Sequence, residues 1–152
     1  MDRKVNKKKM NISLGSDHAG FKEKEKIKEY LKSKGFNVFD KGTFSKDSVD
    51  YPEYGHAVGI SVQSNESEKG IVFCGSGIGI SIAANKVKGV RAALCHTVEH
   101  AKMSRLHNDA NVLALGARMT DYDLLINIID IWLSTEFEGG RHQHRLEKIE
   151  VS

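Results

Sequence analysis

Short apolar runs alternate with amphipathic stretches along the chain. We predict strands in the apolar runs, at residues 11–16, 36–42, 70–74, 89–95 and 111–116. We predict helices in the stretches between and after them, at residues 21–34, 52–63, 80–86, 97–108, 121–133 and 141–152. Because strand and helix alternate five times, the pattern favours an α/β fold with one parallel sheet covered by helices on both faces.

Local signals support several helix boundaries. Pro52 suits the first turn of a helix, and Thr97 can cap the helix that follows it. Gly35 suits the end of the first helix, and the glycines at 139–140 separate the last helix from the one before it.

Length and composition indicate one soluble globular domain, which we place at residues 11–152. The chain has 152 residues, 39% hydrophobic and 28% charged, close to the average for such domains. No apolar run approaches the ~20 residues of a membrane-spanning helix, and the N-terminus lacks the apolar segment of a signal peptide. With only Cys74 and Cys95 no disulfide framework is expected, so the reducing cytoplasm is the expected location.

The net charge of +3 is concentrated at the N-terminus. Residues 1–10 hold five basic residues and one acidic residue, a net of +4, so the remaining chain carries −1. We expect residues 1–10 to be a disordered basic leader. The nearly neutral body gives little support for a nucleic-acid partner, and we expect no membrane partner.

Reactive side chains follow the predicted strands. Ligands bind at the carboxyl ends of the strands in such sheets. At these ends stand Asp17-His18, Asp50-Tyr51, Cys74, Cys95-His96 and Gly116-Ala117-Arg118. An acid, imidazoles, a thiol and a guanidinium along one edge indicate a chemically active site rather than a purely structural sheet.

The loop after the third strand, within "IVFCGSGIGISIAANK" (71–86), is the centre of this edge. Gly75 and Gly77 fit a dinucleotide fingerprint, but Ile80 occupies the third glycine position, and no P-loop lysine follows. The glycines still allow a close approach to an anion, and the next helix adds its positive end. Cys74 at this position favours the thiolate form. The alternative is a buried small hydrophobic residue, which we assign to Cys95.

Five segments closely resemble one enzyme family. They are "SDHAGF", "DYP", "GIVFCGSGIGISIAANK", "SRLHNDANVLALGAR" and "EGGRHQHR". They are similar to the B-type ribose-5-phosphate isomerases and their allose-6-phosphate and galactose-6-phosphate isomerase relatives, over residues 11–151. The resemblance implies a Rossmann-like three-layer α/β/α sandwich. It also implies an aldose–ketose isomerase that needs no metal or other cofactor and works through a cis-enediolate.

The resemblance also assigns roles within the glycine loop. Cys74 is implied to be the base that moves the proton between C1 and C2. Ser76 is implied to shuttle a proton between O1 and O2 or to polarise these oxygens. The backbone amides of the loop would stabilise the enediolate, and Tyr51 would contact the substrate. The loop residues implied to bind substrate are Gly75, Gly77, Ile78 and Gly79. One branch of the family uses a glutamate instead of the cysteine, at the position that Ile80 occupies here, so Cys74 must act.

The remaining roles lie outside that loop. His107 is implied to open the sugar ring with help from Asp17, and Asn108 to hold a hydroxyl or developing charge. The implied phosphate-binding set is His18, Arg118, Arg141 and Arg145. The last two arginines are spaced i, i+4, so one helix face presents both guanidiniums.

Two histidine pairs are not expected to bind metal. His142 and His144 are two residues apart and fall on different faces of a helix. His96 and His100 have the spacing of a zinc-binding helix, but the glutamate of that motif is missing from its place.

Topology suggests that two subunits share each site. Cys74 leaves a strand, whereas His107 ends the helix that leads into the next strand, so they lie at opposite edges of the sheet. A two-fold dimer, or a dimer of dimers, could join these edges, with the C-terminal helix reaching toward the partner subunit.

Three other functions remain open from the residues alone. The chain could be a phosphometabolite-binding module without catalysis, one subunit of a hetero-oligomeric galactose-6-phosphate isomerase, or a thiol hydrolase. The preferred sugar phosphate is not readable, and ribose 5-phosphate is the expected substrate.

Overall fold

The computed structural model describes residues 10–151. Residues 1–9, most of the predicted basic leader, lie outside this part. Met10, which we predicted to belong to the leader, packs against the first core cluster.

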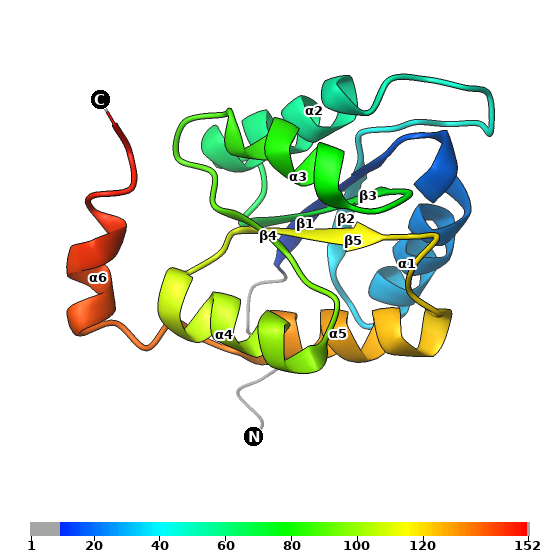
Figure 1. Ribbon diagram of the computed structural model, residues 1–152. Coiled ribbons are helices and arrows are strands. Elements are labelled where there is room, and N and C mark those ends of the chain that lie inside the picture. The colour runs from blue at the N-terminus through cyan, green and yellow to red at the C-terminus, as the bar shows by residue number, and fades with distance from the viewer. Residues whose placement is uncertain (1–9, 152) are drawn as a thin grey trace.

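A five-stranded parallel sheet forms the centre of the molecule, with the strand order β2-β1-β3-β5-β4 (Figure 1). The strands are β1 (Asn11–Ser16), β2 (Asn37–Asp40), β3 (Lys69–Cys74), β4 (Ala92–Leu94) and β5 (Val112–Gly116). The helices are η2 (His18–Gly20), α1 (Phe21–Ser33), α2 (Tyr51–Gln63), α3 (Ile78–Asn85), α4 (Val98–Asn108), α5 (Tyr122–Ser134) and α6 (Arg141–Leu146). The predicted α/β fold with a parallel sheet is therefore confirmed.

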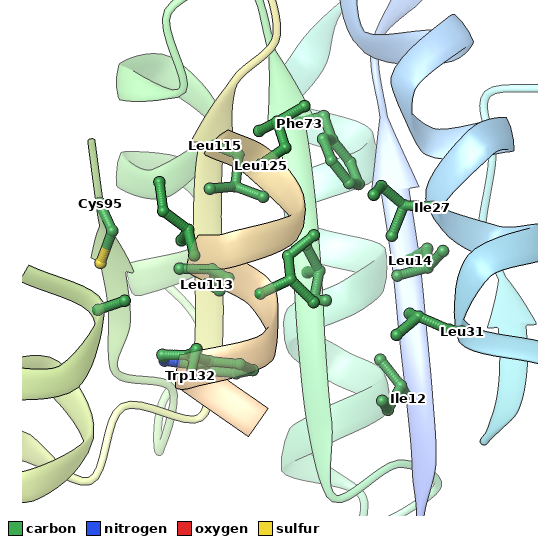
Figure 2. Packing of buried hydrophobic residues seen from close by; sticks show 14 of the residues in the cluster. Ile12, Leu14, Ile27, Leu31, Phe73, Cys95, Leu113, Leu115, Leu125 and Trp132 are labelled. Atoms are coloured by element: carbon green, nitrogen blue, oxygen red, sulfur yellow. The ribbon is translucent and has the colours of Figure 1, made fainter. Parts of the chain in front are cut away.

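Alternating side chains of the strands build a core on each face of the sheet. Phe73 and Leu113 point to the face covered by α1, α4 and α5, where they pack with Trp132 and Leu125 (Figure 2). Their neighbours, including Val72, point to the other face and pack with residues of α2 and α3. The sheet is thus buried between two helical layers, as expected for a three-layer sandwich.

Three predicted elements are at least three residues shorter in the structure. The strand expected at 36–42 spans only Asn37–Asp40. The strand expected at 89–95 spans only Ala92–Leu94, because Gly89 adopts a left-handed turn with φ of 86°. The helix expected at 141–152 ends at Leu146. Beyond it, the Glu150 carboxylate accepts a hydrogen bond of 2.8 Å from the Gly89 amide, which ties the end of the chain to the turn before β4.

The short helix η2 was not predicted, and α3 begins two residues before its predicted start. Thr97 caps α4 as predicted, with its hydroxyl accepting a hydrogen bond of 3.0 Å from the His100 amide. No helix between residues 10 and 151 combines the length and apolar character required to cross a membrane.

Candidate active site

The strand register brings three loops together at the carboxyl edge of the sheet. Cys74 at the end of β3 pairs with Gly116 at the end of β5. The Asp17 amide, just after β1, donates to the Phe73 carbonyl at 3.2 Å, and the Ala117 amide donates to the Cys74 carbonyl at 2.8 Å. The residues that follow β1, β3 and β5 therefore emerge side by side at the carboxyl edge, which is the edge predicted for them; their adjacency follows from the strand order.

Cys74 sits beneath the glycine loop, and its side chain is directed into the turn. Its Sγ accepts a hydrogen bond of 3.2 Å from the Gly77 amide, and the residue is 5% exposed. Gly77 is left-handed, with φ of 80°, and an added β-carbon would lie 2.8 Å from the Leu115 carbonyl carbon. Only glycine fits this turn. The turn directs the Gly77 N–H at Cys74 Sγ, and this hydrogen bond stabilises negative charge on the sulfur.

Ser76 and two neighbouring amides line the same loop. The Ser76 Oγ accepts a hydrogen bond of 3.1 Å from the Ile78 amide, so its own hydroxyl hydrogen is free to be donated. The Gly75 and Ser76 amides make no hydrogen bond to any residue that the structure describes. These groups can bind an oxyanion next to the thiol.

Tyr51 and Arg118 close over the two ends of the loop. A β-carbon on Gly79 would lie 2.6 Å from the ring carbon Cζ of Tyr51, so the ring lies directly on this glycine. A β-carbon on Gly75 would be 3.5 Å from Cδ of Arg118, which places that exposed side chain beside the loop. An aromatic ring thus lies beside Gly79 and an arginine side chain beside Gly75, at the two ends of the glycine loop.

Asp17 and His18 complete this edge. Asp17 is 7% exposed and caps η2, with Oδ1 accepting from the amides of Ala19 at 2.9 Å and Gly20 at 3.2 Å. The other carboxylate oxygen accepts no hydrogen bond from any residue between 10 and 151. His18 Nδ1 accepts a hydrogen bond of 3.1 Å from the Val49 amide, which fixes the ring and leaves Nε2 to carry the proton. No local pattern indicates this contact with Val49, which lies 31 positions away.

A second group of predicted site residues lies at the opposite, amino edge of the sheet. His107 and Asn108 end α4, just before β5 begins at Val112. Arg141 and Arg145 lie on α6, which packs against α4 at this end (Figure 1). Within one chain, therefore, the structure does not bring these four residues to Cys74.

The end of α4 is fixed by a buried arginine. Arg105 is 5% exposed and donates to Asp109 Oδ1 at 2.8 Å, to the Ala110 carbonyl at 2.8 Å and to the Thr135 carbonyl at 3.0 Å. Asp109 itself is left-handed, with φ of 45°, and ends the helix. This network holds His107 at a rigid helix end.

Sequence reasoning missed the surroundings of His107. The His107 ring stacks on the buried ring of His142, with centroids 4.3 Å apart and planes 17° apart. Burial lowers the pKa of His142 below its usual value, and the neighbouring positive charge of Arg141 adds to that effect. Glu138 Oε1 lies 3.2 Å from His142 Nε2. Glu138 and His142 are four positions apart, whereas His107 comes from a distant helix that no local pattern connects to them.

The second thiol, Cys95, lies on the other face of the sheet from Cys74. Cys95 is 1% exposed and belongs to the first core cluster. Burial raises the pKa of its thiol to about 11, so it stays protonated and unreactive at neutral pH. These features agree with its prediction as a core residue.

Comparison with known proteins finds close relatives over nearly the whole described chain. A family model described as Ribose/Galactose Isomerase matches residues 12–149. Ribose-5-phosphate isomerase B of Escherichia coli (strain K12) is 48% identical over 138 residues, which cover 91% of this chain and 93% of that protein.

Solved structures give the same result. A ribose-5-phosphate isomerase B from Clostridium thermocellum is 54% identical, with a TM-score of 0.91 over 92% of this chain and 95% of its own. The Mycoplasma genitalium ribose-5-phosphate isomerase B, solved with bound ribulose-5-phosphate, is 45% identical, with a TM-score of 0.88 over 91% of this chain and 93% of its own.

Proposed function

This chain belongs to the ribose/galactose isomerase family and is an isomerase, and we propose that it interconverts ribose 5-phosphate and ribulose 5-phosphate. The observation that carries the proposal is the Cys74 thiol beneath the glycine loop, with amide and hydroxyl donors beside it. Relatives that act on ribose 5-phosphate, at 45–54% identity, support this choice of sugar.

The reaction transfers one proton from C2 to C1 of the open-chain sugar. The Cys74 thiolate removes the C2 proton, and the electron pair of that bond forms the C1–C2 double bond of a cis-enediolate, with negative charge on O1. The free amides of Gly75 and Ser76 stabilise this charge. The Ser76 hydroxyl passes the proton from O2 to O1, and the Cys74 thiol returns its proton to C1, which leaves the ketone at C2.

Ring opening and phosphate binding need the second group of residues. His107 moves the proton between the sugar hydroxyl and the ring oxygen, with Asp17 assisting, and Asn108 holds a hydroxyl. Arg141 and Arg145, both exposed on one face of α6, grip the phosphate with His18 and Arg118.

Because these groups lie at opposite edges of the sheet, we propose that each site is shared between two subunits of a dimer. One subunit supplies Cys74, Tyr51 and Arg118, and its partner supplies His107 and the two arginines of α6. Two-fold symmetry then creates two equal sites.

The assay of purified full-length protein against ribose 5-phosphate, allose 6-phosphate and galactose 6-phosphate tests the substrate, with kcat/KM as the measure. We expect the highest value for ribose 5-phosphate. A preference for galactose 6-phosphate would replace this proposal with the alternative in the family's description. Binding without turnover would instead favour a non-catalytic module.

A further inference from the structure

Three metal-binding groups meet at the amino edge of the sheet. His107 ends α4, His142 lies on α6, and Glu138 stands in the loop between α5 and α6. One ligand atom of each residue lies within 4.8 Å of the other two. Two imidazoles and one carboxylate are the set that zinc uses in sites with an open coordination position.

His142 provides an independent sign that a ligand is missing. The residue is 5% exposed, and its Nε2 makes no hydrogen bond to any residue between 10 and 151. The Glu138 carboxylate is 3.2 Å away but does not meet hydrogen-bond geometry. A buried nitrogen without a partner is costly, and a metal ion between the ring and the carboxylate would satisfy both.

We propose that His107, Glu138 and His142 form a binding site for a divalent zinc-like cation, which acts as a reversible inhibitor. At zinc–ligand distances of about 2.0–2.2 Å, tetrahedral ligand atoms stand about 3.3 Å apart. The pair of Glu138 and His142 already has this spacing, at 3.2 Å.

One movement completes the site. In the stacked arrangement of the two rings, the lone pairs in their planes run side by side instead of converging. His107 must therefore turn out of the stack to direct a nitrogen at the ion. It is half-buried at a helix end, so a side-chain rotation suffices. The nearby guanidinium of Arg141 opposes a dication, and we expect an affinity well below that of structural zinc sites.

The inhibitory effect rests on the proposed function, because His107 is the group proposed to open the sugar ring. An imidazole that holds zinc cannot transfer a proton. The ion and the sugar phosphate therefore exclude each other, and inhibition by zinc should be relieved by a chelator.

Binding is measured first, by calorimetric titration of ZnCl2 into the full-length wild-type protein in a phosphate-free, non-chelating buffer. We expect one ion per chain at this site. Glu138→Gln and His142→Gln should each weaken it at least about 10-fold, since even losing a group that only supports a ligand costs 10–100-fold. Thermal melts in the absence of zinc check that each variant is folded.

Two matched controls identify the ligands. His96→Gln/His100→Gln removes the half-buried His96, which precedes α4, and the exposed His100 in its first turn. Cys74→Ala removes the thiol of the proposed active site. Both should bind zinc like the wild type. Unchanged binding in the Glu138 and His142 variants, or loss of binding in either control, would overturn the site.

Activity is measured second, on ribose 5-phosphate with and without added zinc. Glu138→Gln should keep its metal-free activity, and its inhibition constant for zinc should rise by the same factor as its dissociation constant. Zinc binding at these residues without inhibition would overturn the link to ring opening while the site itself stands. If the protein isomerises no sugar at all, the proposed function fails, and the binding titration still decides the metal site.

Discussion

The separation of Cys74 from His107 leads to a test of the shared site by subunit mixing. Cys74 pairs with Gly116 at the end of β5, whereas His107 precedes Val112 at the start of that strand. The four steps from Val112 to Gly116 span about 13 Å at ~3.3 Å per residue, and His107 lies beyond this span. The atoms that Cys74 and His107 must reach, C2 and the ring oxygen, belong to a sugar whose five carbons span at most about 6 Å.

Buried side chains of the strands fill the space between the two residues. Leu113, Ala114 and Leu115 are completely buried, so neither reactive side chain can reach through the sheet. One subunit therefore provides only half of the groups that the proposed reaction needs. Cys74→Ala and His107→Ala proteins should each be nearly inactive for this reason.

Mixing the two variants should restore activity. After joint unfolding and refolding in equal amounts, random pairing makes about half of the dimers mixed. Each mixed dimer has one site with both residues intact and one with both replaced. Isomerase activity should therefore return to roughly a quarter of the wild-type value.

Differently tagged chains allow the mixed dimers to be isolated by two affinity steps, and light scattering gives their mass. Refolded wild type is the reference for yield. If each site lay within one chain, both sites of a mixed dimer would lack a residue. Mixed dimers without activity, or a protein that is active as a monomer, would refute the reasoning.

Three further predictions concern single residues of the proposed site. Cys74→Ala should lower kcat by about 10²-fold or more, whereas Cys95→Ala should keep most activity. Iodoacetamide should label Cys74 first, and bound substrate should protect it. Equal losses of activity in the two variants would contradict the role of Cys74 as base. Arg145→Ala should raise KM for the phosphorylated sugar and weaken binding of inorganic phosphate in a titration, so an unchanged KM would argue against a phosphate grip. Gly79→Ala should raise KM with little change in melting temperature, because the new β-carbon would displace the Tyr51 ring that lies 2.6 Å away; wild-type kinetics would mean that this ring does not contact substrate.

Many of the site residues at the carboxyl edge of the sheet could be predicted, because they directly follow strands that the local hydrophobic pattern reveals. The rule that ligands bind after parallel strands pointed to Asp17 and Cys74 before any strand order was known. The order itself could not be read, because pairing depends on contacts between distant segments. The hydrogen bond between Gly89 and Glu150, which joins the turn before β4 to the segment after α6, could not be read either, because it spans 61 positions.

The environment of His107 marks the limit of local reasoning. As a lone histidine at a helix end it suits a cap, and its distance along the sequence from Glu138 and His142 hides its contact with them. The structure stacks the His142 ring on the ring of His107, 35 positions earlier, and places the Glu138 carboxylate 3.2 Å from His142 Nε2. The three residues converge because α6 packs against α4, and such tertiary contacts between helices leave no periodic trace in the sequence.

The two halves of the proposed site differ in how they are built, and this difference bears on how the enzyme could change its substrate. The half of the site around the Cys74 thiol is formed largely by backbone, with free amides at Gly75 and Ser76. A residue larger than glycine would disrupt the left-handed turn at Gly77 and the Tyr51 ring packed on Gly79. The phosphate half is formed by exposed side chains on a six-residue helix that contacts the body mainly through α4. Small shifts of that helix would change the distance between phosphate and thiol without disturbing the base. Sugars of different length, such as those in the family's description, could therefore be accommodated by the placement of α6, while the chemistry at Cys74 stays the same.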